Sequence, residues 1–189
     1  MRTATCEIIG ISPYSQSRPV RAEHLENELP QKYEERTWKE RLNCDPEGNV
    51  FIPGMAFKNA LTSAAQYRSE KVPGKRNATY TKHFTSGVVV TTNASLGIRR
   101  EDVAGEWLFV PSDGKRGGGS RVWKQFPIIP DPWKTSIEFH ILDDAISDEV
   151  FKAHLKHAGT LIGLGRFRPQ NNGFYGRFKL GAIKWTTLD

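Results

Sequence analysis

The sequence is poor in cysteine and has no long apolar run. Its 189 residues include two cysteines, Cys6 and Cys44, and neither lies in a Cys-x-x-Cys or Cys/His spacing. A disulfide framework and a zinc motif are therefore excluded as organising features, and a reducing, cytoplasmic setting fits best. No stretch approaches the roughly 18 apolar residues of a membrane span, and the N-terminus has no apolar signal segment. We expect a cytoplasmic protein with no membrane partner.

Acidic residues are in the minority, and the two signs of charge are unevenly distributed. The 27 lysines and arginines exceed the 21 aspartates and glutamates, which leaves a formal net charge of +6. Acids gather over residues 23–47 and 138–149, whereas residues 71–82, 115–124 and 166–184 are predominantly basic. A polyanionic partner is compatible with this balance without being required by it.

The segment 163–178 contains no acidic residue and reads Gly-Leu-Gly-Arg-Phe-Arg-Pro-Gln-Asn-Asn-Gly-Phe-Tyr-Gly-Arg-Phe. Its glycines allow a backbone to approach a phosphodiester chain, and its arginines can fork onto phosphates. Aromatic faces stack on unpaired bases, and side-chain amides both donate and accept. The candidate contacts with single-stranded nucleic acid are Arg166, Phe167, Arg168, Asn171, Asn172, Tyr175 and Arg177. The alternative is a glycine-rich loop with solvated arginines and core aromatics.

Within that segment, the neighbours Phe174 and Tyr175 should have different roles. Successive side chains of an extended backbone face opposite ways, so we expect one ring to stack on a base and the other to lie in the core. We predict that Tyr175 is the stacking member, because its hydroxyl tolerates a wet site.

Hydrophobic periodicity predicts a core of four strands and two helices. The expected strands cover residues 3–11, 87–93, 135–142 and 178–186, and the expected helices cover residues 55–67 and 147–159. In the first helix the buried stripe is predicted to comprise Phe57, Ala60, Leu61 and Ala64. The second should begin at the cap residue Ser147 and end at Gly159.

The chain order of these elements is strand, helix, strand, strand, helix, strand. This order predicts an α+β, ferredoxin-like (RRM-like) βαββαβ core. In the second helix, His154 and His157 lie one turn apart, but without a third ligand nearby they indicate a polar helix face, and no metal or other cofactor is expected.

Two segments interrupt this core, so we predict a single domain, 1–189, with two insertions. Residues 12–49 are polar and charge-dense and predict an arm, which Tyr33 and Trp38 could close onto the domain or onto another subunit; a mobile loop is an equal alternative. Residues 106–128 predict a β-hairpin with a basic, glycine-rich tip that lacks the Walker spacing.

Further cations are candidate phosphate ligands. Lys58 lies in the first turn of its helix, where a cation is unfavourable beside the helix dipole, which suggests a phosphate partner as an alternative to a solvated lysine. The tip of the hairpin either stays loose or becomes ordered on a phosphate backbone. The remaining candidates are Arg18, Lys75, Arg76, Lys82, Lys115, Arg116 and Arg121.

Two motifs resemble the RAMP superfamily, the repeat-associated proteins that build CRISPR effector complexes. Residues 51–61, Phe-Ile-Pro-Gly-Met-Ala-Phe-Lys-Asn-Ala-Leu, are similar to the Ile-Pro-Gly-x-x-x-Lys-x-x-Leu/Ala helix start of that superfamily. Segment 163–178 resembles its C-terminal glycine-rich loop. The backbone subunit that polymerises along guide RNA is the member that this chain resembles most, over most of the core. The arm and the hairpin would correspond to its thumb-like and web-like insertions.

The resemblance implies a non-catalytic protein of a ribonucleoprotein for antiviral defence. Such a protein binds single-stranded nucleic acid, with RNA favoured over DNA, and forms a homo-oligomer along the strand together with other effector-complex subunits. Backbone subunits that cleave target RNA carry an aspartate in the loop after the first strand, but residues 12–18 contain no carboxylate. This departure argues against catalysis.

Three alternatives stay open. A metal-dependent endoribonuclease of the same superfamily would need clustered acids, for which Asp143 and Asp144 are the adjacent pair. A single-stranded-DNA-binding protein would use the same cations and rings. Because the chain is short for an effector backbone, it is also compatible with a small solitary relative.

Overall fold

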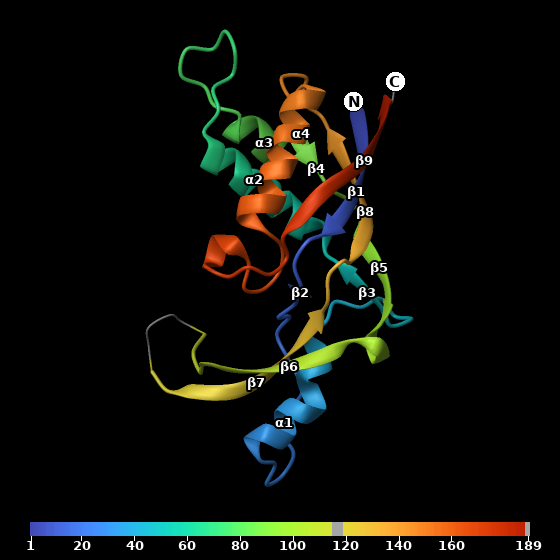
Figure 1. The fold of residues 1–189 in the computed structure, drawn as a ribbon, viewed down its shortest axis with the longest axis vertical. Helices are drawn as coiled ribbons and strands as arrows, with labels where there is room; N and C mark the ends of the chain where they lie inside the picture. Colours follow the sequence, from blue (N-terminus) through green and yellow to red (C-terminus); the bar gives the residue numbers. More distant parts are fainter. Residues whose placement is uncertain (115–118, 188–189) are drawn as a thin grey trace.

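The structure is a computed structural model of residues 1–189, and residues 1–114 and 119–187 are described. The candidates Lys115 and Arg116 lie outside the described residues. The fold is mixed α+β with antiparallel sheets, as the sequence predicts (Figure 1). Its main sheet has the strand order β4-β8-β1-β9. These strands are β4 (Val88–Val89), β8 (Lys134–Ile141), β1 (Arg2–Gly10) and β9 (Phe178–Thr187).

Two helices, α2 (Gly54–Arg68) and α4 (Asp148–His157), pack on one face of this sheet. The ring of Phe57 on α2 meets Phe139 on β8 edge-on, with the centroids 6.5 Å apart. Phe151 on α4 approaches the same ring at 5.3 Å. The predicted stripe on α2 is confirmed, because its members Phe57, Ala60, Leu61 and Ala64 are all buried. On β8, alternate residues are buried, as its period of two predicts.

Helix α4 begins as predicted, with the Ser147 hydroxyl accepting from the Val150 amide. The prediction that Gly159 ends it is wrong, because a π-helical turn, η3 (Ala158–Ile162), continues as far as Gly163. Gly159 is required for a different reason. A Cβ at this position would lie 2.1 Å from the carbonyl oxygen of Phe178, so glycine lets the helix pass close to β9.

The prediction of a polar face at His154 is also wrong. This side chain is fully buried, stacks on Phe84 with the ring centroids 4.3 Å apart, and donates Nδ1–H to the Val150 carbonyl at 2.7 Å. Burial lowers the pKa of His154, which favours the neutral ring. Phe84 belongs to the short helix α3 (Thr81–Gly87), which the sequence did not predict because seven residues show no clear periodicity.

The strand predicted over 87–93 is much shorter in the structure, because Gly87 ends α3 and only Val88 and Val89 pair with β8. The chain then enters β5 (Ala94–Arg99), which pairs with β3 (Asn49–Ile52) in a separate two-stranded sheet. Among the described residues, no helix is long and apolar enough to cross a membrane.

The hairpin is confirmed as two paired strands, β6 (Ala104–Pro111) and β7 (Arg121–Ile129), and β2 (Tyr14–Ser15) extends this sheet. Below it lies the arm, which contains α1 (Pro30–Thr37) and the 3-10 turn η1 (Trp38–Arg41) (Figure 1). The remaining 3-10 turns are η2 (Arg100–Asp102) and η4 (Pro169–Asn171).

The arm contacts the domain through buried polar groups, so of the alternatives given by the sequence the structure favours closure onto the domain. Arg41 forms an ion pair with Glu34, with Nη2 at 2.6 and 2.9 Å from the two carboxylate oxygens, and neither side chain is more than a tenth exposed. Arg41 Nε also donates to the Gln125 carbonyl on β7 at 3.1 Å. Trp38 packs against the core, while Tyr33 stays within the arm and stacks on His24.

Candidate nucleic-acid interface

The glycine-rich segment folds back on itself beside the start of the arm. The Leu164 amide donates to the Gly176 carbonyl at 3.0 Å, and the Arg166 amide donates to the Ser15 carbonyl at 2.9 Å. Gly176 has a φ of +66°, and a Cβ there would lie 1.9 Å from the Leu164 carbonyl oxygen. Gly165 is similarly close to Ser15. These two glycines therefore serve the packing of the loop itself, a need that the sequence interpretation did not include.

The structure reverses the predicted roles of the two neighbouring rings. Tyr175 is buried, and its hydroxyl donates to Glu106 on β6 at 2.8 Å. Burial and this bond raise the pKa of Tyr175 to about 12. Phe174 is 54% exposed and Phe167 is 43% exposed. The expectation that one ring is exposed and the other is buried therefore holds, but the choice of Tyr175 as the exposed member is wrong, because Glu106 offers its hydroxyl a partner inside the protein. The rings available for stacking are therefore Phe167 and Phe174.

Arg166 is the most constrained cation of the segment. Its guanidinium carbon lies 3.6 Å from the centroid of the Phe126 ring, within cation–π range. Its Nη1 is buried and has no hydrogen-bond partner among residues 1–114 and 119–187. Burial lowers the pKa of Arg166, although an arginine remains charged at neutral pH. A buried, charged donor without a partner is costly, so an acceptor entering from outside would be stabilised there.

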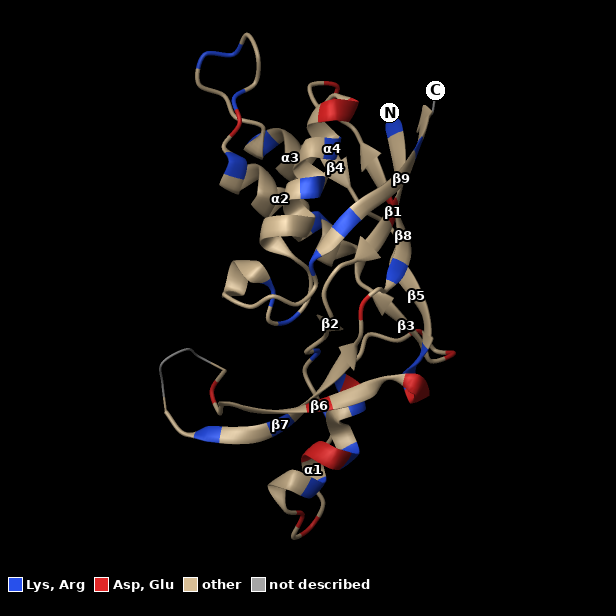
Figure 2. Cartoon of the chain, viewed as in Figure 1, with Lys and Arg blue, Asp and Glu red and all other residues tan. Residues whose placement is uncertain are grey.

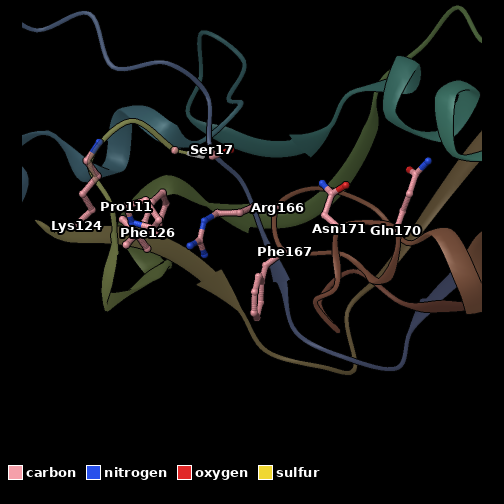
Figure 3. A pocket seen from close by; sticks show the side chains of 10 residues that line it. Ser17, Pro111, Lys124, Phe126, Arg166, Phe167, Gln170 and Asn171 are labelled. Carbon is pink, nitrogen blue, oxygen red and sulfur yellow. The ribbon is translucent and has the colours of Figure 1, made fainter. Parts of the chain in front are cut away.

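Two cavities meet at Arg166. Cavity 1, about 700 Å³, lies between the hairpin and the glycine-rich segment and is lined in part by Lys124, Phe126 and Phe167 (Figure 3). Cavity 2, about 370 Å³, lies between that segment and the start of α2, where Arg18 and Arg168 line it. Ser17 and Arg166 line both cavities, so the two adjoin.

The other predicted residues of the segment lie around these cavities. Arg168 is half-buried and donates Nη1–H to the Gly165 carbonyl at 3.2 Å, while Asn171 lines cavity 1. Asn172 is exposed. Arg177 is half-buried and is held by its backbone, with its amide donating to the Ser12 hydroxyl at 2.9 Å.

Several predicted cations lie elsewhere. Lys75, Arg76 and Lys82 are exposed and follow α2 in the chain, whereas cavity 2 is lined by residues at the N-terminal end of α2. Figure 2 shows basic positions, in blue, on the loop that joins α2 to α3. Arg121 lines a separate cavity beside Trp123. The sequence interpretation missed contributions from the hairpin and the exposed ring, namely Lys124, Phe126 and Phe174. Lys124 stands in a basic stretch, but no sequence signal distinguishes Phe126.

Lys58 has a structural partner. Its ammonium donates to the carbonyls of Phe84 and of Thr85, the latter at 2.9 Å, in the last turn of α3. Burial lowers the pKa of Lys58. These bonds explain a cation in the first turn of α2 without a phosphate, because a cation at the C-terminal end of α3 is favourable. The phosphate role stays a prediction.

Lys58→Ala distinguishes these two roles. We expect its free energy of unfolding to fall by about 1–3 kcal/mol, because the partly buried carbonyl of Phe84 and the exposed carbonyl of Thr85 lose a charged donor, while nucleic-acid affinity stays unchanged. Urea denaturation measures the first quantity and fluorescence anisotropy the second. Arg168→Ala is the matched control. We expect it to leave the free energy of unfolding nearly unchanged and to weaken nucleic-acid binding. A Lys58→Ala protein of normal stability and weakened binding would restore the phosphate role.

Asp143, considered above for metal chemistry, is engaged in the structure. It accepts from Nδ1 of His83 at 2.6 Å and from the Ala145 amide at 2.9 Å, and the bond from His83 is the main reason that its pKa is lowered. Asp143 precedes α4, while the glycine-rich segment follows it, so the helix separates the two. Over residues 1–114 and 119–187, no group of three or more His, Cys, Asp or Glu is placed to hold a metal ion.

No family model matches the sequence, and no curated protein matches it significantly. Solved structures do match. One is a chain of the type III-B Cmr-beta complex bound to cognate target RNA, with a TM-score of 0.52 and 14% identity. The match covers 97% of this chain and 60% of that one. Another is Cmr6 from Pyrococcus furiosus, with a TM-score of 0.50 and 15% identity over 94% of this chain and 98% of that one. The chain therefore shares its fold with Cmr6 and with a chain of the Cmr-beta complex, and the resemblance predicted from its motifs is confirmed at the level of fold.

Proposed function

We propose that this protein binds single-stranded RNA, without cleaving it, in the groove formed by cavities 1 and 2. The observation that carries the proposal is Arg166, whose stacked guanidinium lies where the two cavities meet and whose Nη1 has no partner in the part of the chain that the structure describes. A phosphate oxygen or a base carbonyl entering the groove would supply the missing acceptor. One hydrogen bond would then satisfy both the Arg166 donor and an acceptor of the bound strand.

The chemistry around Arg166 suits a flexible single strand. Arg18, Lys124 and Arg168 provide cations for phosphates, and the exposed faces of Phe167 and Phe174 provide stacking surfaces. A rigid duplex would keep its bases from these rings. Because phosphates and ring faces carry little sequence information, we expect weak sequence preference. RNA is favoured over DNA because the Cmr-beta complex is bound to RNA.

The finer fold assignment belongs with this proposal. We infer that β1, α2, β4, β8, α4 and β9 form a ferredoxin-like core, because they follow one another in the βαββαβ order and the sheet order β4-β8-β1-β9 places the first and third strands at its centre. The arm and the hairpin are then insertions that supply one wall of the groove.

Assembly along the strand with further copies and other effector subunits follows from the resemblance alone. Absence of cleavage is proposed because residues 12–18 lack a carboxylate and Asp143 is engaged away from the groove.

Salt dependence tests the proposal. With three or four phosphates neutralised, a plot of log affinity for a uridine oligomer against log salt should have a slope of about −2 to −3, at about 0.7 per contact. Arg18→Ala with Arg168→Ala should reduce that slope by about 1.4. Lys179→Ala, an exposed position on β9, is the control. An affinity that does not change with salt concentration, or that is higher for a duplex than for a single strand, would contradict the proposal.

A further inference from the structure

A third cavity, of about 240 Å³, lies behind the base of the arm and is lined by more cations than acids. The cations come from three separate segments: Arg18 and Arg21 from the chain after β2, Lys39 from η1 and Arg100 from η2. The acids are Glu40 and Asp45. Four positive charges against two negative ones, brought together from distant parts of the sequence, make this an electropositive site.

Among the described residues, both acids of this cavity accept hydrogen bonds from the protein, whereas most of its cations donate none from their side chains. Asp45 accepts from the backbone and side-chain amides of Asn49 at 2.7 and 2.8 Å, and Glu40 accepts from the Arg21 amide. Lys39 donates to the Glu101 carbonyl at 2.9 Å. In the described part of the chain, no hydrogen bond or ion pair engages the guanidinium groups of Arg18, Arg21 and Arg100, which are exposed.

Arg18 joins this cavity to the groove. It lines both cavity 2 and the third cavity, just as Ser17 and Arg166 line both cavity 1 and cavity 2. The Arg18 amide donates to the Arg41 carbonyl at 3.1 Å, so the shared residue has a fixed backbone. The three cavities therefore form a continuous series from the hairpin, past the glycine-rich segment, to the base of the arm.

We propose that the bound strand continues beyond the glycine-rich segment and places a phosphate in the third cavity, between Arg18, Arg21 and Arg100. This inference rests on the proposed function and extends it by a second, remote phosphate site. Guanidinium forks match the geometry of a phosphodiester. Because Arg18 serves both cavities, a strand leaving cavity 2 meets the third without crossing an uncharged surface.

The chain has a built-in reporter for occupancy of this site. Cys44 lines the third cavity and is half-buried, whereas Cys6 is fully buried within β1. Burial raises the pKa of Cys6 to about 12. Burial also raises the pKa of the less buried Cys44, where Arg100 and Arg18 oppose the rise and Asp45 and Glu101 add to it. Mildly alkaline iodoacetamide should thus alkylate Cys44 much faster than Cys6.

The experiment compares alkylation of Cys44 with and without saturating uridine oligomers of about 4 to 16 nucleotides, the range covered by single binding domains. Peptide mass spectrometry assigns the modified thiol, and anisotropy under the same conditions confirms saturation. We expect the shortest oligomers to bind without protecting Cys44 and the longest to slow its alkylation at least tenfold. Protection by every length alike, or by none of the bound lengths, would overturn the continuous path.

A paired substitution excludes an indirect effect on the thiol. Arg21→Ala with Arg100→Ala should weaken binding of the longest oligomer about tenfold and lower its salt slope by about 0.7, the value for the one phosphate proposed in this cavity, while affinity for the shortest stays unchanged. Equal losses for both lengths would overturn the inference. If no oligomer binds the wild-type protein, the proposed function itself fails, and the anisotropy measurement identifies that case.

Discussion

Replacing Glu34 with alanine should lower the free energy of unfolding by about 3–5 kcal/mol, the cost of leaving one member of a buried ion pair alone. Arg41 would keep a nearly buried guanidinium without its carboxylate. The Gln125 amide on β7, which donates to Glu34 at 3.3 Å, would also lose its acceptor. Urea denaturation followed by tryptophan fluorescence measures the change.

Two controls separate the ion pair from helix propensity and side-chain volume. Glu35→Ala removes an exposed partner of Lys32 from the same helix and should cost about 0.2–1 kcal/mol. Glu34→Leu with Arg41→Met removes both buried charges and should cost clearly less than Glu34→Ala, because apolar replacement of a whole pair is often neutral, although the backbone amide and carbonyl of Gln125 lose their partners. If Glu34→Ala is as stable as Glu35→Ala, the arm is not held by this pair.

The same pair links the arm to the groove. The guanidinium carbon of Arg41 lies 5.1 Å from the centroid of Phe126, the ring on which Arg166 stacks at 3.6 Å. By pairing with Arg41, Glu34 holds that guanidinium over the Phe126 ring, on which Arg166 also stacks. Because Glu34→Ala loosens the arm beside the groove, we expect this variant to bind RNA more weakly. The apolar double replacement should keep the arm in place and therefore keep its RNA affinity.

The sequence predicts the regular part of this fold well, because that part is governed by periodicity. The buried stripe of α2 and the alternation on β8 follow from spacings of three to four and of two. The cap at Ser147 follows from local hydrogen bonding. Each signal lies within one element and needs no knowledge of its neighbours.

The remaining differences arise from contacts between distant segments. His154 is buried because it meets Phe84 from an unpredicted helix, and Gly159 is glycine because β9 passes beside it. Glu34 and Arg41 look like solvated charges in the sequence, yet each compensates the burial of the other. Such pairings depend on tertiary placement, which no local pattern encodes.

The candidate site shows the same division. The arginines and amides around cavities 1 and 2 could be predicted from the composition of segment 163–178, whereas the wall opposite them could not. Phe126 lies about forty residues away in sequence and contributes only because β7 passes beside the loop. Likewise, Tyr175 is buried because Glu106 on β6 accepts its hydroxyl.

Replacing both Phe167 and Phe174 with alanine should weaken binding of uridine oligomers by about 30-fold to about 20,000-fold, since each base stack contributes about 1–3 kcal/mol and every 1.4 kcal/mol is about tenfold in affinity. The loss in stability should be much smaller than that of a core phenylalanine, because about half of each ring is exposed. Tyr175→Phe is the matched control. It removes only the hydroxyl bond to Glu106, so stability should fall by about 0.5–1.5 kcal/mol with affinity unchanged.

A second ring pair provides the decisive comparison. Phe109 and Trp123 are also exposed, with centroids 5.3 Å apart, but they line the cavity with Arg121 and Leu29. Along β7, Trp123 and Lys124 are successive residues, so their side chains face opposite sides of the hairpin. Phe109→Ala with Trp123→Ala should therefore leave RNA affinity unchanged. If this pair lowers affinity and the Phe167 and Phe174 pair does not, the strand follows the opposite face of the hairpin, and Arg166 has no part in binding it.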